Sequence, residues 1–202
     1  MPVSAIIFDL GNVLLPFDYS IVIEKLNEKS SGLGFRYAEK YKQNYNVHRD
    51  YEKGLMTDSD FLDVIMEWTE NKVERETFCK YFSRIFSVNE RIASILPELS
   101  KNYRLFLLSN TSNIHRIYGW NDYSFLQNFE KLFLSYQVGA NKPEKEIYQA
   151  VTNYTKLPYG EHLFIDDVKE YADAAKKLGW DAINFLSEQQ CIDELKKRNI
   201  KF

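Results

Sequence analysis

The sequence predicts an α/β fold in which a doubly wound parallel sheet carries an all-helical insertion. Five short apolar runs, each bounded by polar or turn residues, indicate buried strands, and helical patterns separate the later runs. A long stretch after the first run shows helical periodicity and no convincing strand. Strands that alternate with helices favour a parallel sheet that is covered on both faces.

The predicted strands and helices follow one another in a regular order. The strands are residues 4–8, 103–108, 131–135, 162–165 and 181–185. One predicted helix, at about 143–154, has Pro143 in its first turn. Another, at about 168–178, stops at Gly179, as helix ends prefer.

Residues 17–88 are the predicted helical insertion, so that residues 1–16 and 89–202 form the core. At 202 residues, the chain is long enough for one core with a small accessory domain but not for two full domains. Thr57 or Asp58 is the expected N-cap of the helix in TDSDFLDVIMEWTE.

Composition and charge restrict the class of protein. A hydrophobic fraction of 45% excludes a disordered chain. The net charge of −3 and the absence of long Lys or Arg runs indicate neither nucleic acid nor membrane as a partner, which leaves small soluble molecules. Cys79 and Cys191 have no metal-ligand spacing and indicate no disulfide framework. Because Asp9 interrupts the N-terminal apolar run, we expect no secretory signal and a cytoplasmic protein; the sequence leaves the oligomeric state unknown.

Polar side chains follow four of the predicted strands. The carboxyl ends of parallel strands meet at one edge of the sheet, so these side chains are expected to lie close together. In chain order they are Asp9, the group Ser109, Asn110 and Thr111, then Lys142, and finally Asp166 and Asp167.

This set of side chains suits the transfer of a phosphoryl group. A carboxylate such as Asp9 can attack phosphorus in line and form an acyl phosphate. Because carboxylate and phosphate repel each other, a cation must screen both, and clustered carboxylates are ligands that Mg²⁺ accepts. Ser109 can donate a hydrogen bond to phosphate, and Lys142 can supply a compact positive charge.

Each of these residues also has a simpler interpretation. Asp9 can be a turn residue, Ser109 or Thr111 can cap a helix that begins nearby, and Asp167 can cap the helix that follows it. Lys142 resists such an explanation, because a lysine just before a helix faces the positive end of the helix dipole unless an anion lies between. Together, the simpler interpretations require four coincidences at one edge of the sheet.

Four motifs resemble those of the haloacid dehalogenase-like hydrolase superfamily in order and spacing: FDLGNV, LLSNT, KP before a helix, and FIDD. The insertion resembles the C1-type cap of that superfamily, and the resemblance implies a Rossmann-like core with an inserted all-helical cap domain. The runs IFDLGNVLLPFD, LLSNTSNIH and KPEKEIYQ are most similar to the bacterial α-D-glucose-1-phosphate phosphatase subgroup. The resemblance implies Mg²⁺-dependent hydrolysis of a small phosphorylated metabolite, such as a sugar phosphate, through an aspartyl phosphate on Asp9.

The resemblance also implies roles for individual residues. The implied catalytic residues are Asp9, Ser109 and Lys142. The implied metal ligands are Asp9, the backbone carbonyl of Gly11, Asp166 and Asp167, with Asp167 favoured for direct ligation. The implied substrate contacts are Asn12, Asp18, Ser109, Asn110 and Lys142.

Gly11 departs from the pattern of most phosphatases of this superfamily, in which this position is a second aspartate that acts as general acid and base. Such a group is commonly worth about 10²–10⁴ in rate. Either the leaving group is unusually good, as in a sugar 1-phosphate, or a carboxylate from elsewhere takes the role, Asp18 being the nearest candidate. Tyr171 is a second departure, because related sequences often carry asparagine there, near the metal site.

Two other functions remain open. A 2-haloacid dehalogenase would use Asp9 to attack carbon without metal or general acid, which explains Gly11 but leaves Asp166 and Asp167 without a purpose. A catalytically weak relative would bind a phosphorylated ligand without turnover.

An aromatic stripe in the insertion also has two interpretations. Tyr37, Tyr41, Tyr45 and His48 fall near one helical face and can stack on a sugar ring. Packing inside the insertion is the favoured interpretation, because such stripes usually face the interior.

Overall fold

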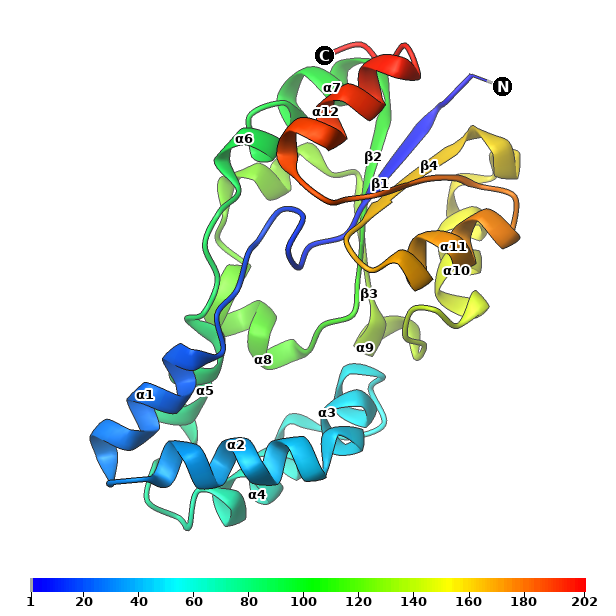
Figure 1. Ribbon diagram of the computed structural model, residues 1–202. Coiled ribbons are helices and arrows are strands. Elements are labelled where there is room, and N and C mark those ends of the chain that lie inside the picture. The colour runs from blue at the N-terminus through cyan, green and yellow to red at the C-terminus, as the bar shows by residue number, and fades with distance from the viewer. Residues whose placement is uncertain (1) are drawn as a thin grey trace.

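The computed structural model describes residues 2–202, which contain a five-stranded sheet with all strands parallel. The strands are β1 (Ala5–Phe8), β2 (Arg104–Ser109), β3 (Lys131–Leu134), β4 (His162–Asp166) and β5 (Asp181–Asn184). Their order is β3-β2-β1-β4-β5, which confirms the predicted fold class and places each strand within one residue of its predicted bounds. Because β1 is the central strand, the residue that follows it emerges in the middle of the sheet edge (Figure 1).

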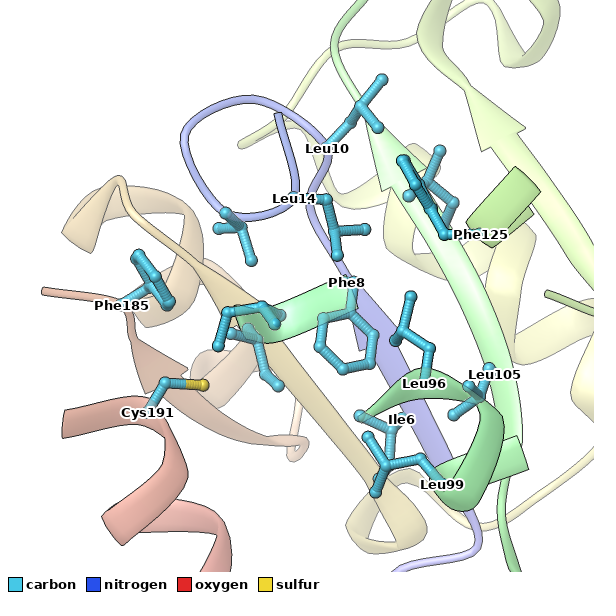
Figure 2. Packing of buried hydrophobic residues seen from close by; sticks show 14 of the residues in the cluster. Ile6, Phe8, Leu10, Leu14, Leu96, Leu99, Leu105, Phe125, Phe185 and Cys191 are labelled. Atoms are coloured by element: carbon cyan, nitrogen blue, oxygen red, sulfur yellow. The ribbon is translucent and has the colours of Figure 1, made fainter. Parts of the chain in front are cut away.

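Helices cover both faces of the sheet. On one face lie α6 (Glu90–Ala93), α7 (Leu96–Asn102) and α12 (Glu188–Lys197); on the other lie α10 (Lys145–Thr155) and α11 (Lys169–Lys177). Side chains alternate along each strand: Ile6 and Phe8 pack in the first layer (Figure 2), whereas Ala5 and Ile7 pack in the second. The central strand β1 is therefore buried on both sides, as its uniformly apolar sequence requires.

Short elements complete the core after β2 and β3. They are α8 (Asn113–His115), the π-helical η1 (Arg116–Trp120), the 3-10 helix η2 (Ser124–Asn128), α9 (Ser135–Val138) and the 3-10 helix η3 (Tyr159–Glu161). None of the helices within residues 2–202 is both long enough and apolar enough to cross a membrane.

Two predicted helix starts need correction. Pro143 does not lie in the first turn of α10, which begins at Lys145, because Glu144 N–H first closes a turn onto the carbonyl of Asn141 (2.7 Å). The cap of α8 is Ser112, whose hydroxyl accepts a hydrogen bond from His115 N–H (3.3 Å). The capping interpretations of Ser109 and Thr111 are therefore wrong.

The insertion between β1 and β2 has its own hydrophobic core. Its helices are α1 (Ser20–Lys29), α2 (Leu33–Gln43), α3 (Tyr45–Glu52), α4 (Asp58–Trp68) and α5 (Arg75–Ser83). Buried side chains such as Leu26, Phe61 and Phe78 hold them together. Thr57 caps α4 in a capping box with Asp60, which decides between the two caps expected from sequence.

Two connections join the insertion to the core and pair with each other. Phe17 and Phe86 form an antiparallel bridge, and Ser87 N–H donates to the carbonyl of Pro16 (2.9 Å). The boundaries predicted at 16/17 and 88/89 fall inside this paired region, and we propose them as the limits of the cap.

Helix α3 docks the insertion onto the loop that follows α9 (Figure 1). Arg49 donates a hydrogen bond to the carbonyl of Lys142 (3.2 Å), and Asn141 donates to the carbonyl of Arg49 (3.0 Å). Lys53 pairs with Glu144 (2.7 Å). The insertion therefore contacts the same loop that carries Lys142.

Candidate active site

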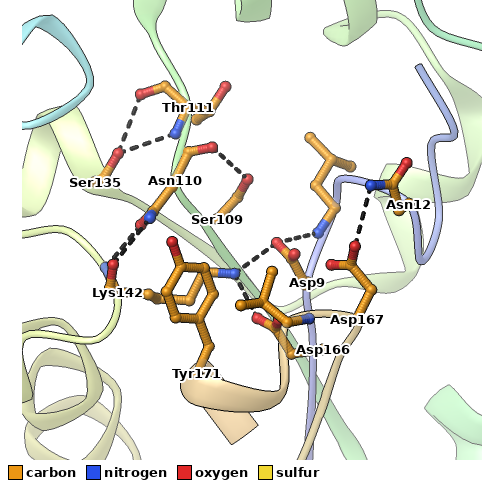
Figure 3. A network of polar contacts seen from close by, with 12 residues as sticks. Asp9, Asn12, Ser109, Asn110, Thr111, Ser135, Lys142, Asp166, Asp167 and Tyr171 are labelled. Atoms are coloured by element: carbon orange, nitrogen blue, oxygen red, sulfur yellow. Dashed lines mark hydrogen bonds and ion pairs between the residues drawn. The ribbon is translucent and has the colours of Figure 1, made fainter. Parts of the chain in front are cut away.

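Asp9 lies directly after the central strand. Its N–H donates to the carbonyl of Ile165 in β4 (2.9 Å), which fixes its backbone in the sheet. Its carboxylate Oδ1 accepts a hydrogen bond from Leu10 N–H (2.7 Å) and lies 2.8 Å from Nζ of Lys142. The side chain is thus held at the carboxyl edge of the sheet in one orientation (Figure 3).

Lys142 is almost fully buried, with 1% of its surface exposed, and its Nζ bridges Asp9 (2.8 Å) and Asp166 (2.7 Å). Burial alone would lower the pKa of Lys142, but the two carboxylates outweigh it and raise that pKa. The amide of Asn110 holds the lysine backbone, accepting from Lys142 N–H (2.7 Å) and donating to its carbonyl (3.1 Å). Because Lys142 precedes a helix, its place in the sequence required an anion beside it. The carboxylates of Asp9 and Asp166 are the anions that the structure places there.

Two aromatic rings lie against the Lys142 ammonium. Its Nζ is 5.2 Å from the ring centre of Tyr171 and 5.6 Å from that of Phe164. Cations are stabilised by the faces of such rings. Tyr171, a departure from the family pattern in sequence, thus packs on the lysine (Figure 3).

Asp166 and Asp167 differ in what they contact. Asp166 is fully buried; its Oδ2 pairs with Lys142 and its Oδ1 accepts from Val168 N–H (2.8 Å). Asp167 is half-buried, and its Oδ2 accepts a hydrogen bond from the side-chain amide of Asn12 (3.0 Å). The carboxylate that receives the backbone N–H before α11 is therefore Asp166, so the capping interpretation of Asp167 is wrong.

Asp9, Asp166 and Asp167 form a cluster that fits a divalent cation. Each offers one carboxylate oxygen, and these oxygens all lie within 4.8 Å of one another. Burial raises the pKa of Asp9 more than Lys142 lowers it, and the Asp166 carboxylate adds to the increase, so that the pKa is about 8. One lysine does not balance three carboxylates, and a bound Mg²⁺ would supply the missing positive charge. The Gly11 carbonyl accepts one hydrogen bond, from Val13 N–H (2.7 Å), and keeps a second lone pair.

The pKa of Asp9 gives an expected dependence of stability on pH. An unfolded aspartate titrates near 3.8 and folded Asp9 near 8, so between these values the folded state binds the extra proton. In chelator, this group therefore makes the protein less stable as pH rises from about 4 to about 8. Mg²⁺ binds the ionised carboxylates, so its stabilising effect is expected to be larger at pH 8 than at pH 5.

Thermal unfolding with Mg²⁺ and with chelator, across this pH range, measures both effects. Each kcal/mol of stabilisation corresponds to a rise of about 2–4 °C in Tm for a chain of this size. The variant Asp9→Asn is the matched control, because it has no titrating group at this position. A Tm that Mg²⁺ leaves unchanged at pH 8 would contradict the metal site.

The remaining residues expected at the site do not all lie together. Ser109 is buried at the end of β2, and its hydroxyl donates to the carbonyl of Asn110 (3.3 Å). Thr111 exchanges hydrogen bonds with the Ser135 hydroxyl and supports the loop. The structure does not bring Asp18 into the site: its exposed carboxylate accepts a hydrogen bond from Ser20 N–H (2.8 Å) at the start of α1.

Within residues 2–202, two adjoining cavities extend from this edge of the sheet. The smaller, of about 210 Å³, reaches Asp9, Lys142 and Asp167. The larger, of about 380 Å³, runs from Ser109 into the insertion. Residues that line both are Gly11, Phe17, Tyr45, Glu52 and Asn110.

The sequence allowed the aromatic stripe of the insertion either to stack on a sugar ring or to pack inside the insertion, and its residues differ in where they lie. Tyr37 is buried in the core of the insertion, as predicted. Tyr41, Tyr45 and His48 line the larger cavity, although Tyr41 also packs on that core. A helical pattern does not distinguish a wall of a cavity from a packed interior, because both faces are apolar.

Phe17 occupies the space beside Gly11. A Cβ atom added to Gly11 would lie 3.2 Å from Cε1 of the Phe17 ring, closer than ordinary van der Waals contact. The position where the superfamily pattern has an acidic side chain is thus bordered by an aromatic ring. The sequence pattern does not reveal this contact.

The pattern also does not single out Arg49 and Glu52. Glu52 is buried, with Oε1 3.2 Å from Nε2 of His48 and Oε2 3.4 Å from Nη1 of Arg49. The spacing of these three residues on one helix face, three and four positions apart, is the signal that was present in the sequence.

The chain belongs to the haloacid dehalogenase-like hydrolases: its residues 6–185 match that family. It is 24% identical over 193 residues to a D-ribitol-5-phosphate phosphatase from Bacteroides thetaiotaomicron, covering 89% of this chain and 90% of that protein. These comparisons confirm the resemblance predicted from the four motifs and make the protein a member of an enzyme family.

Solved structures show the same fold. A haloacid dehalogenase family enzyme from Bacteroides thetaiotaomicron, in complex with magnesium and inorganic phosphate, has a TM-score of 0.79 and 29% identity, covering 90% of this chain and 93% of that one. A family hydrolase from Porphyromonas gingivalis has a TM-score of 0.77 and 21% identity, covering 98% and 99%.

Proposed function

We propose that this protein is a Mg²⁺-dependent phosphomonoester hydrolase whose substrate is a small sugar or polyol phosphate. The observation that carries the proposal is the placement of Asp9, a buried carboxylate at the end of the central strand, beside Lys142 and two further carboxylates. Two similarities support it: one relative is a polyol phosphate phosphatase, and one structural neighbour is a complex with magnesium and phosphate.

Asp9 is the proposed nucleophile. Its carboxylate attacks phosphorus, the bond from phosphorus to the leaving oxygen breaks, and the leaving alkoxide takes a proton from solvent or from a nearby group. Water then attacks the aspartyl phosphate, which releases inorganic phosphate and restores the carboxylate. Lys142 opposes the effect of burial on the pKa of Asp9 and balances negative charge on the phosphoryl group.

The proposed metal ligands are Asp9, Asp167 and the Gly11 carbonyl, with Asp166 beside them. Bound Mg²⁺ would screen the repulsion between the carboxylate and the phosphate dianion. Asp167 is the favoured direct ligand because it is half-buried and pairs with Asn12, whereas both oxygens of Asp166 are engaged by Lys142 and Val168 N–H. Asn12 therefore supports a metal ligand in this proposal.

Phosphate release from a panel of esters tests the function. The panel contains a pentitol 5-phosphate, sugar 1-phosphates, sugar 6-phosphates and 4-nitrophenyl phosphate, each with Mg²⁺ and with chelator. We expect turnover that requires Mg²⁺; a preference for 1-phosphates would support a good leaving group as the explanation of Gly11. No turnover even of the activated aryl ester would refute the proposal, and chelator-resistant halide release from haloacids would favour the dehalogenase alternative.

A further inference from the structure

Glu52 lies where the two cavities meet. As the last residue of α3, it lines the smaller cavity together with Asp9 and Lys142, and the larger cavity together with Tyr41 and His115. Among residues 2–202 it is the only carboxylate that lines both. A substrate with its phosphate at Asp9 and the rest of its structure in the larger cavity must pass this side chain.

The Glu52 carboxylate is held in an ionised state. Burial would raise the pKa of Glu52, but the imidazole of His48, the guanidinium of Arg49 and the ammonium of Lys142 outweigh burial and lower it. An ionised carboxylate only accepts hydrogen bonds and has about four acceptor sites, of which His48 and Arg49 take one each. Sites remain for donors on a ligand, such as hydroxyl groups.

Three tyrosines and one histidine in the wall of the larger cavity are neutral polar groups. Burial raises the pKa values of Tyr19, Tyr41 and Tyr45, so their hydroxyls stay protonated. His115 is buried and its pKa is well below its usual value, so it is neutral; within residues 2–202, neither of its ring nitrogens has a hydrogen-bond partner. Among these residues, no lysine or arginine lines the larger cavity.

This distribution of charge favours a neutral leaving group. A second phosphate or a carboxylate on the substrate would enter a cavity whose wall contains an ionised glutamate and neither lysine nor arginine, and would lose its hydration there. A polyhydroxylated leaving group instead offers hydroxyl donors to Glu52 and carbon–hydrogen faces to the aromatic side chains of the wall.

We propose that Glu52 is the specificity-determining residue: its carboxylate accepts hydrogen bonds from the hydroxyl groups of a neutral polyhydroxylated leaving group and repels acidic ones. The inference rests on the proposed phosphatase function, because it assumes that the phosphate binds at Asp9. It assigns the choice between neutral and acidic leaving groups to a residue of the insertion, and family membership alone does not specify this choice.

The test compares Glu52→Gln with the wild-type protein on three esters. They are a pentitol 5-phosphate, 4-nitrophenyl phosphate, which carries no hydroxyl group, and phosphoglycolate, which carries a carboxylate. We expect kcat/KM for the pentitol ester to fall about 10- to 100-fold, as for loss of a hydrogen bond to a charged group. The kcat/KM for the aryl ester should change by less than about 3-fold, and this activity also shows that the variant folds. The ratio of kcat/KM for pentitol phosphate to that for phosphoglycolate should decrease.

Two further variants separate selection from structural damage. Glu144→Gln is the matched control: this glutamate pairs with Lys53 at the same interface but lines neither cavity, so all three esters should react as with wild type. Glu52→Asp keeps the charge on a shorter side chain, and it should retain more activity on the pentitol ester than Glu52→Gln.

Each alternative result has a definite meaning. An equal loss on the pentitol and aryl esters would show that Glu52 acts through Arg49 on the phosphate site, and would overturn the inference. No loss on either ester would overturn it as well. If the wild-type protein hydrolyses none of the three esters, the phosphatase function itself fails, and this inference fails with it.

Discussion

Replacing Asp9 by asparagine is expected to lower the turnover of every phosphate ester by roughly 10³-fold or more, because the amide cannot form the acyl phosphate. The fold should persist, since asparagine has nearly the same shape and a neutral group suits this buried place. In chelator at pH 8 the Tm of the variant should be no lower than that of wild type, because the carboxylate it lacks is ionised there at the expense of stability.

Rapid acid quenching followed by mass spectrometry measures the intermediate directly. The wild-type protein should carry a phosphoryl group on the peptide that contains Asp9, and the variant should not. The matched control is Asp18→Asn, the same exchange at an exposed aspartate outside both cavities, which should keep full activity. Loss of activity in this control would indicate that Asp18 takes the general-acid role that Gly11 cannot fill. Full activity in Asp9→Asn would refute Asp9 as the nucleophile.

Replacing Lys142 by methionine is expected to destabilise the protein by about 3–5 kcal/mol at pH 8 in chelator. Methionine fills much of the same volume, but the carboxylates of Asp9 and Asp166 then remain buried without their cation. Burial already raises the pKa of both carboxyl groups, so they take up protons as pH falls. The loss of stability should therefore become smaller at pH 5, as measured by urea unfolding at both pH values.

The control for this variant is Lys53→Met. Lys53 forms an ion pair with Glu144 that is about one-third exposed, and such pairs contribute only about 0–1 kcal/mol. Its replacement should change the free energy of unfolding far less than that of Lys142, at either pH. Equal effects of the two replacements would mean that the buried lysine does not offset the two carboxylates.

The sheet and the residues at its edge could be predicted because both depend on local sequence. A strand buried on both faces must be apolar throughout, and a polar residue at its end marks where it leaves the sheet, as Asp9 and Ser109 do. In a parallel sheet these ends share one edge, so the order of motifs was sufficient to bring Asp9, Lys142 and Asp166 together.

The walls of the cavities could not be predicted in the same way. Glu52 and Arg49 are charged residues on the same face of α3 as His48, and a charged residue can face solvent or another part of the protein. Only the docking of α3 on the loop that carries Lys142 decides between these. Asp18 was instead expected near the site and does not lie there. It is close to Asp9 in sequence, but the chain turns it outward to the start of α1.

The contact between Gly11 and Phe17 limits how this site can change in evolution. The Phe17 ring packs edge-on against Tyr19 (5.4 Å between ring centres) and Phe86 (6.1 Å). An aspartate introduced at position 11 would press its Cβ against this ring, which would have to shift by a few tenths of an ångström. Because residues in contact commonly have non-additive effects, we expect substitutions at 11 and 17 to be epistatic, with a smaller residue at position 17 favouring an acid at position 11.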